Sequence, residues 1–255
     1  MDVPGISRPA LLAMIVVALL LFAFGSTAAV GLMTQHTDTH TRVLAARSTL
    51  VVDADTGDIR VRAADRADVR LTTKLTRSVW GGGRARVSDD GARLRLDDRC
   101  HNVPLVGGPC GISYVLEVPR ATNVRIVTGT GDVHAEHLDG AADIRSSTGD
   151  LHVTGVRGPV RASADTGDVD VDSPAAAIAV HTVTGDIGIV ATAPRSIRAE
   201  AVTGDVDVVV PDRTYAVEAD SEVGVDHVGV RVDDGARRRV SAHTQTGDVH
   251  VEPGR

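Results

Sequence analysis

One four-residue phrase, Thr-Gly-Asp followed by Val, Ile or Leu, recurs along the chain and constrains its fold more than any other feature. Its glycine–aspartate pairs are Gly57-Asp58, Gly131-Asp132, Gly149-Asp150, Gly167-Asp168, Gly185-Asp186, Gly204-Asp205 and Gly247-Asp248. From Gly131 to Gly204, successive phrases are 18, 18, 18 and 19 residues apart. A fixed period of this length, with a turn residue in every repeat, is typical of stacked-coil proteins.

Apolar residues alternate with polar ones on both sides of each phrase, as in strands with one buried face. Val160 and Ala162 precede one phrase, and Val169 and Val171 follow it. Two such strands and two corners use about 18 residues, so neighbouring coils should stack as parallel strands about 4.8 Å apart. The sequence therefore predicts an all-β fold, a parallel β-solenoid over residues 124–255. Its pattern weakens near Gly224, and a last coil is expected to end around Gly247.

Each residue type in the phrase has a structural role at a corner. Glycine adopts a positive φ at little cost. The aspartate can accept hydrogen bonds from backbone N–H groups at the corner, and the threonine can stack on its copies in neighbouring coils. We therefore interpret the glycine–aspartate pairs as structural turns.

Two metal-binding alternatives remain open on the sequence alone. Stacked coils would align Asp132 with its equivalents in a column of like charges, which a cation such as calcium could compensate. Two positions after each aspartate lies an outward column that includes His134, His152 and Asp170, residue types that bind transition metals. Neither pattern matches an established site, so no metal, cofactor or catalytic residue is assigned.

Residues 49–123 depart from the regular period. Leu50-Val51-Val52 begins a first coil around Gly57, and no phrase is readable until Gly131. In between, Ser88-Asp89-Asp90-Gly91 predicts the turn of a β-hairpin. We interpret this section as the first coil followed by a β capping region that covers it, because an uncovered coil end exposes unpaired strand edges.

An uncharged stretch over residues 9–33 follows a short N-terminal tail, residues 1–8. Its length suits a single transmembrane helix or signal anchor, which needs about 20 apolar residues. Ser26-Thr27-Ala28 also offers a cleavage site, so a cleaved and secreted form stays open. Residues 34–48 are polar and are expected to form a linker between the membrane segment and the β-domain.

The two cysteines, Cys100 and Cys110, lie close together in a chain that carries a membrane-targeting segment. This combination predicts a disulfide and places the C-terminal domain outside the cytoplasmic membrane. The net charge of −7 argues against nucleic-acid binding, which needs a basic surface. Aromatic residues make up 2% of the chain, which leaves few rings for stacking on sugars or bases.

Together the apolar segment, the Trp80-Gly81 loop, the cysteine pair and the serial Thr-Gly-Asp-Val phrases resemble the bacterial putative-adhesin family, a β-strand-repeat domain of unknown function. The resemblance covers about residues 44–252. It implies a β-solenoid on the bacterial cell surface and supplies no ligand or catalytic residues.

We therefore expect a membrane-anchored, extracytoplasmic surface module for adhesion, binding or scaffolding. Its partner would be a cell-envelope component or a membrane protein. One alternative is an envelope sensor or accessory protein that works through a membrane partner. Another is a polysaccharide-active enzyme, which is disfavoured because coils of 18 or 19 residues leave no room for the long loops that build a cleft.

Overall fold

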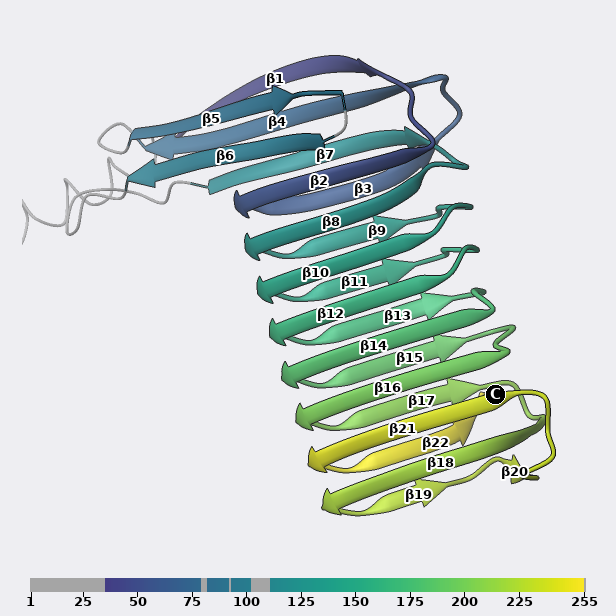
Figure 1. The fold of residues 1–255 in the computed structure, drawn as a ribbon. Coiled ribbons are helices and arrows are strands. Elements are labelled where there is room, and N and C mark those ends of the chain that lie inside the picture. The colour runs from purple at the N-terminus through teal and green to yellow at the C-terminus, as the bar shows by residue number, and fades with distance from the viewer. Residues whose placement is uncertain (1–34, 79–81, 92, 102–110, 255) are drawn as a thin grey trace, which may run out of the picture. The chain divides into compact units, whose positions relative to one another are not determined.

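The computed structural model describes residues 35–78, 82–91, 93–101 and 111–254 (Figure 1). The chain divides into two units, of which the larger comprises Thr39–Lys74, Ala85–Asp98 and Ile112–Arg255. Every coil discussed below belongs to this larger unit. Within the described residues all regular structure is β-strand, and no helix is long and apolar enough to cross a membrane.

The strands form two sheets of 11 strands each. Sheet A has the spatial order β1 (Gln35–Ala45), β4 (Asp68–Ser78), β7 (Gly111–Pro119), β3 (Asp58–Ala64), β9 (Val133–Glu136), β11 (Leu151–Thr154), β13 (Val169–Ser173), β15 (Ile187–Ala191), β17 (Val206–Val210), β22 (Val249–Pro253) and β19 (Asp226–Val228). Sheet B has the order β20 (Arg231–Val232), β18 (Thr214–Val223), β21 (Arg239–Thr246), β16 (Ser196–Thr203), β14 (Ala177–Thr184), β12 (Val160–Thr166), β10 (Ala142–Thr148), β8 (Asn123–Thr130), β2 (Thr49–Thr56), β6 (Arg93–His101) and β5 (Gly82–Asp89). The prediction of an all-β fold of stacked strands is confirmed.

Each regular coil contributes one strand to sheet B, turns at the phrase, and contributes the next strand to sheet A (Figure 1). Neighbouring coils pair in parallel without a register shift, so that Thr148 lies beside Thr130 on one side and Thr166 on the other. The core lies between the sheets and consists mainly of Val, Ile, Leu and Ala. Such small side chains suit sheets packed about 10 Å apart.

At the C-terminal end the coils do not stack in chain order. Strand β21 lies between β16 and β18, and β22 lies between β17 and β19. The coil of residues 239–253 is thus inserted between the coil of residues 196–210 and the coil of residues 214–228. The last coil in sequence is therefore not the last in space. Its inner residues Val240 and Val249 are fully buried.

A similar crossing at the other end explains the long gap between the first two phrases. Strand β2 pairs with β8 and β3 pairs with β9, so Gly57 stacks directly on Gly131. Strands β6 and β7 lie on the opposite side of this first coil, where β6 pairs with β2 and β7 with β3. The first coil is therefore enclosed by the segment that we expected to cap it.

Residues 34–48 are not an irregular linker, because Gln35–Ala45 forms β1 beside β4. The apolar alternation was missing because β1 is an edge strand, exposed along most of its length. The apolar segment at 9–33, Trp80, Gly81 and Cys110 lie outside the described residues, and the side chain of Cys100 is not described either. The disulfide and the membrane anchor stay predictions.

Candidate functional site

The phrase corners stack so closely that they leave no space for a side chain on the glycines. All seven phrase glycines have positive φ, between 101° and 141°. A Cβ added to Gly167 would lie 2.3 Å from the carbonyl oxygen of Gly149 in the preceding coil. Gly224 continues the same column, because its added Cβ would lie 1.9 Å from the carbonyl oxygen of Gly247. The column therefore follows the spatial order of the coils.

The phrase aspartates form a continuous ladder of hydrogen bonds. The Oδ1 of Asp150 accepts the backbone N–H of Asp168 at 2.9 Å, and the Oδ1 of Asp132 accepts that of Asp150 at 3.0 Å. The pattern holds from Asp58 to Asp248, whose Oδ1 accepts the N–H of Val225 at 2.8 Å. Each donor belongs to the neighbouring coil, whereas we had placed it at the same corner. These N–H groups compensate the column of like charges.

Metal binding finds no support in these columns. Within the part of the chain that the structure describes, no three His, Cys, Asp or Glu side chains come together in a way that could hold a metal ion.

The outward column on sheet A contains more histidines than the sequence suggested. In spatial order its members are Arg60, His134, His152, Asp170, Gly188, Asp207, His250 and His227. The order His-His-Asp is thus repeated in reverse on the other side of Gly188. Sequence reasoning missed His227 because the phrase at Gly224 lacks the threonine and aspartate of the others. Counting three residues from Gly224, as from the other phrase glycines, would have found it.

The two halves of this histidine column have similar contacts. The Nδ1 of His152 lies 3.2 Å from a carboxylate oxygen of Asp170, and the Nδ1 of His250 lies 3.3 Å from one of Asp207. His134 stacks on His152 with ring centroids 4.9 Å apart. Partial burial, followed by the neighbouring His152 and Arg60, lowers the pKa of His134. The histidine column is thus a polar surface in which His152 and His250 lie beside carboxylates and His134 stacks on His152.

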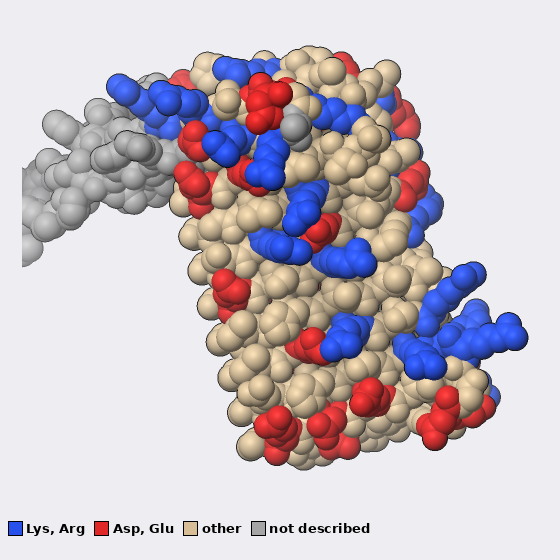
Figure 2. Space-filling view, viewed as in Figure 1, with Lys and Arg blue, Asp and Glu red and all other residues tan. Residues whose placement is uncertain are grey.

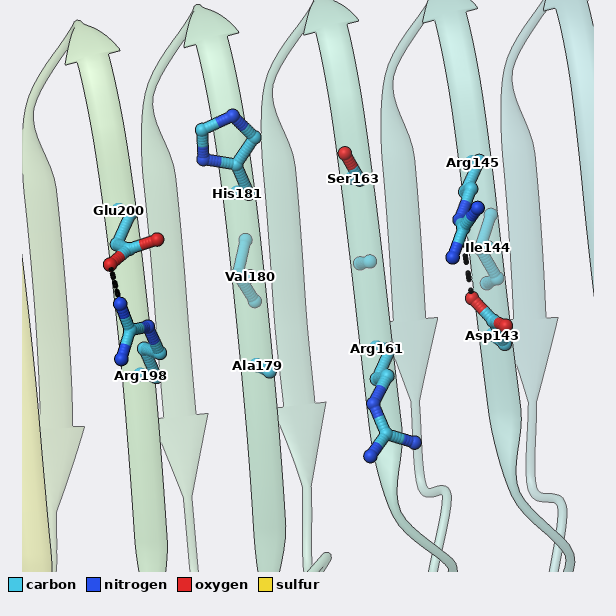
Figure 3. Close-up of a pocket in the computed structure, with 11 residues that line it drawn as sticks. Asp143, Ile144, Arg145, Arg161, Ser163, Ala179, Val180, His181, Arg198 and Glu200 are labelled. Atoms are coloured by element: carbon cyan, nitrogen blue, oxygen red, sulfur yellow. Dashed lines mark hydrogen bonds and ion pairs between the residues drawn. The ribbon is translucent and has the colours of Figure 1, made fainter.

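The outward face of sheet B carries a hollow of about 420 Å³ over strands β10, β12, β14 and β16 (Figure 3). Ser163 and Ala179 are small, and they leave space between larger neighbours. Figure 3 shows Arg161 on one side of Ala179 and Arg198 on the other, with His181 on the same strand as Ala179. The hollow is therefore built by short side chains at the middle of a face that otherwise carries long ones.

The arginines of this hollow differ in their ion pairing. Arg198 is paired with Glu200 on the same strand, and the Nε of Arg145 lies 3.7 Å from Asp143. Arg161 has neither a hydrogen bond nor an ion pair among the described residues. An exposed guanidinium without a carboxylate is free to bind an anion, with five N–H donors in a planar fork.

A second hollow of about 370 Å³ continues along the same face toward β21 and β18 and shares Arg198 with the first. Figure 2 shows Lys and Arg side chains over the β8–β12 part of this face, Asp and Glu near β18, and a further group of Lys and Arg at the edge beside that end. The face thus carries basic groups although the whole chain has a net charge of −7. Three of the residues that line the first hollow are arginines.

Comparison with protein families gives a match to the model described as Toastrack DUF4097 over residues 111–252, more than half of the chain. The chain belongs to this family. The matched region starts at β7 and includes every phrase coil except that of Gly57. The resemblance to the bacterial putative-adhesin family is thereby confirmed, since a solved structure described as a putative adhesin also has a similar fold.

A putative adhesin from Bacteroides fragilis NCTC 9343 has a similar structure, with a TM-score of 0.54 and 13% identity over 85% of this chain and 97% of that chain. A putative cell adhesion protein from Clostridium sporogenes ATCC 15579 gives 0.43 and 11%, over 86% and 100%. A putative lipid binding protein from Parabacteroides distasonis ATCC 8503 gives 0.44 and 9%, over 86% and 97%. No curated protein matches the sequence significantly. The likeness to the Bacteroides fragilis structure supports the fold alone and names no ligand.

Proposed function

We propose that this protein is a membrane-anchored, extracytoplasmic module that binds a component of the cell envelope through the outward face of sheet B. The observation that carries the proposal is the first hollow on that face, where Arg161 lies exposed and has no carboxylate partner among the residues that the structure describes. A binding surface of this kind needs no conformational change, because the strands that form the hollow are held in register by their neighbours.

The expected location supports the same reading. The uncharged segment at residues 9–33 is long enough to span a bilayer, and the cysteine pair suits an oxidising compartment. The description of the Bacteroides fragilis structure as a putative adhesin agrees with a surface role. A cleaved and secreted form would present the same binding face.

A polysaccharide-active enzyme is the competing class, and the hollow offers poor geometry for it. Its two carboxylates, Asp143 and Glu200, lie on β10 and β16. These strands are three positions apart in sheet B, or about 14 Å at 4.8 Å per strand. Glycosidases hold their paired carboxylates about 5–9.5 Å apart. We therefore propose binding without catalysis.

An envelope sensor or accessory role is the second candidate, in which a membrane protein is the partner. Cosedimentation of the purified full chain in detergent separates the two. We expect it to pellet with isolated bacterial cell-wall sacculi, and Arg161→Gln should reduce the pelleted fraction. Arg157→Gln is the matched control, because it also removes one positive charge, at a corner where Arg157 pairs with Asp139. Equal pelleting of all three proteins, or none at all, would contradict the proposal.

A further inference from the structure

We infer that the outward face of sheet B binds a linear anionic glycopolymer, a chain of sugar or polyol units carrying carboxylate or phosphate groups, laid across the strands. The inference rests on the proposed function and names its ligand class. It starts from the spatial register of the arginines on this face rather than from one residue.

Four arginines occupy one register position on every second strand. Arg93 on β6, Arg125 on β8, Arg161 on β12 and Arg198 on β16 are separated by Val51, Asp143 and Ala179 on the strands between them. Since adjacent strands are about 4.8 Å apart, the guanidinium groups recur about every 9.6 Å along the stack. We call this set the arginine column. It crosses the strands and therefore runs parallel to the stacking direction.

Arg125, Arg161 and Arg198 follow the coil period, at separations of 36 and 37 residues. The place of Arg93 cannot be read from the chain in order, because β6 and β2 are neighbours only through the crossing at the N-terminal end. A regular row of positive charges matches a polymer that carries one anionic group per repeating unit. Each unit alone would bind weakly, and several units held at once would bind much more tightly through effective concentration.

The existing ion pairs of the column are weak enough to be exchanged. Arg93 and Arg125 each lie 3.6 Å from a carboxylate, of Asp53 and Asp143, and Arg161 has no such partner. The side chains of Arg93, Arg125 and Arg198 are 47% to 66% exposed. Exposed pairs of this kind contribute about 0–1 kcal/mol. An incoming carboxylate or phosphate can therefore make bidentate contacts without a large loss.

The surroundings favour a glycopolymer over a nucleic acid. Ser163 and His181 line the hollow and can exchange hydrogen bonds with sugar hydroxyls. The described tyrosines, Tyr114 and Tyr215, are both fully buried, so neither of these two rings is offered to a base. Single-stranded nucleic acids are held largely by such stacking. The hollow of about 420 Å³ between Arg161 and Arg198 is open to solvent and holds a small polar unit.

The test measures binding of the full chain to four fluorescent polymers by anisotropy. Polygalacturonate offers carboxylates, poly(glycerol phosphate) offers phosphates, dextran is neutral, and an oligothymidylate tests charge alone. We expect at least one of the first two to bind, with affinity falling as salt is raised. Dextran should not bind, and the oligothymidylate should bind at least about tenfold more weakly.

Substitutions on the column then locate the site. Arg161→Gln should weaken binding about tenfold, the cost of one charge-assisted contact. Ala179→Glu should weaken it at least as much, because it places a carboxylate between Arg161 and Arg198. Both positions face solvent, so the thermal midpoint should not change. Arg157→Gln, the corner control, should bind like the parent chain.

The outcomes separate the ligand class from the proposed function. If the oligothymidylate binds as tightly as the glycopolymers, or if Arg161→Gln and Arg157→Gln weaken binding equally, the inference is overturned. If neither anionic glycopolymer binds while the chain still pellets with sacculi, the ligand class is wrong and the surface-binding function stands. If the chain binds neither polymers nor sacculi, both are wrong.

Discussion

At the scale of single residues, the glycine of the repeated phrase is the position where substitution is least tolerable. Gly167 combines a φ of 136° with a backbone oxygen 2.3 Å from where a Cβ would stand. Both penalties act together, since the substituted residue would have a strained backbone and the preceding coil would have to move. The absence of a side chain at the phrase glycine therefore allows neighbouring coils to approach to the distance between paired strands.

We expect Gly167→Val to destabilise the fold by more than about 3 kcal/mol. Chemical denaturation of the full chain measures the loss. Gly111→Ala is the matched control, because Gly111 lacks positive φ and a Cβ there would meet no atom within 4 Å. It should change stability by less than about 0.5 kcal/mol. A valine variant as stable as the control would show that the corner is not a close contact.

The histidine column gives a pH prediction centred on His134. Burial and the nearby His152 and Arg60 lower the pKa of His134 in the folded state. The unfolded chain, with a histidine pKa of about 6.5, then binds more protons at mildly acidic pH. As the pH falls from neutral toward about 5, His134 therefore lowers the free energy of unfolding, whereas near neutral pH and above it has no such effect.

His134→Gln should accordingly lose less stability than the parent chain between pH 7.5 and pH 5. Denaturation midpoints at the two pH values measure the difference, and the other histidines are common to both proteins. His181→Gln serves as the control, because His181 lies on the opposite sheet, away from this column. An identical pH response of the His134 variant and the parent would rule out the effect.

At the scale of elements, the aspartate ladder ties each coil to the next at its corner. Asp150 accepts the N–H of Asp168 and donates its own N–H to Asp132, so one residue serves two coil boundaries. The carboxylate column would be repulsive without these donors. Backbone N–H groups thus supply the compensation for which a calcium ion was considered.

Asp150→Ala removes the acceptor of the Asp168 N–H and should cost about 1 kcal/mol. Asp150→Asn keeps an acceptor oxygen at the same place and also removes one charge from a like-charged column. We expect the asparagine variant to be within about 0.5 kcal/mol of the parent and more stable than the alanine variant. Thermal unfolding ranks the three proteins. Equal losses in both variants would mean that charge, not hydrogen bonding, is what matters at this corner.

The terminal coil shows how an exposed end differs from an interior coil. Asp226 on β19 is exposed and pairs in register with the buried Val249 of β22. A charge at a position that is apolar in other coils discourages further strand addition. The residues of this coil therefore suit an end, which explains why the phrase is degenerate at Gly224.

At the scale of the whole molecule, the coils near both ends of the described stack are not in chain order. The coil of residues 239–253 supplies the apolar inner face on which the coil of residues 214–228 rests. Exposed valines are concentrated in the latter, at Val223, Val225 and Val228, and just after it at Val232. The C-terminal segment therefore holds an otherwise weak coil in place.

Deleting residues 237–255 should release β18 and β19 from the stack. Strand β18 pairs with β21 and β19 pairs with β22, so the deletion removes the strands on which both rest. Hydrogen exchange should show lost protection in residues 214–228, while β8 to β15 keep theirs because each coil contacts only its neighbours. Unchanged protection in residues 214–228 would contradict the threaded order.

The sequence by itself determined the regular part of this fold. A glycine every 18 or 19 residues, flanked by alternating Val and Ala, permits only short strands that turn at fixed places, so local periodicity was sufficient. The same local rule placed His134, His152 and Asp170 in one column. Local pattern could not place β1, because an edge strand buries too little to show alternation.

Tertiary structure alone decided which coils are neighbours at the two ends. Strand β2 pairs with β8, and β21 pairs with β18, although other strands lie between them in the chain. Such pairing depends on which strand edges bury the most apolar surface together. That choice brought His227 beside His250 and aligned Arg93 with Arg125, Arg161 and Arg198. The sequence specified the coil, and long-range packing specified the surface on which the proposed binding depends.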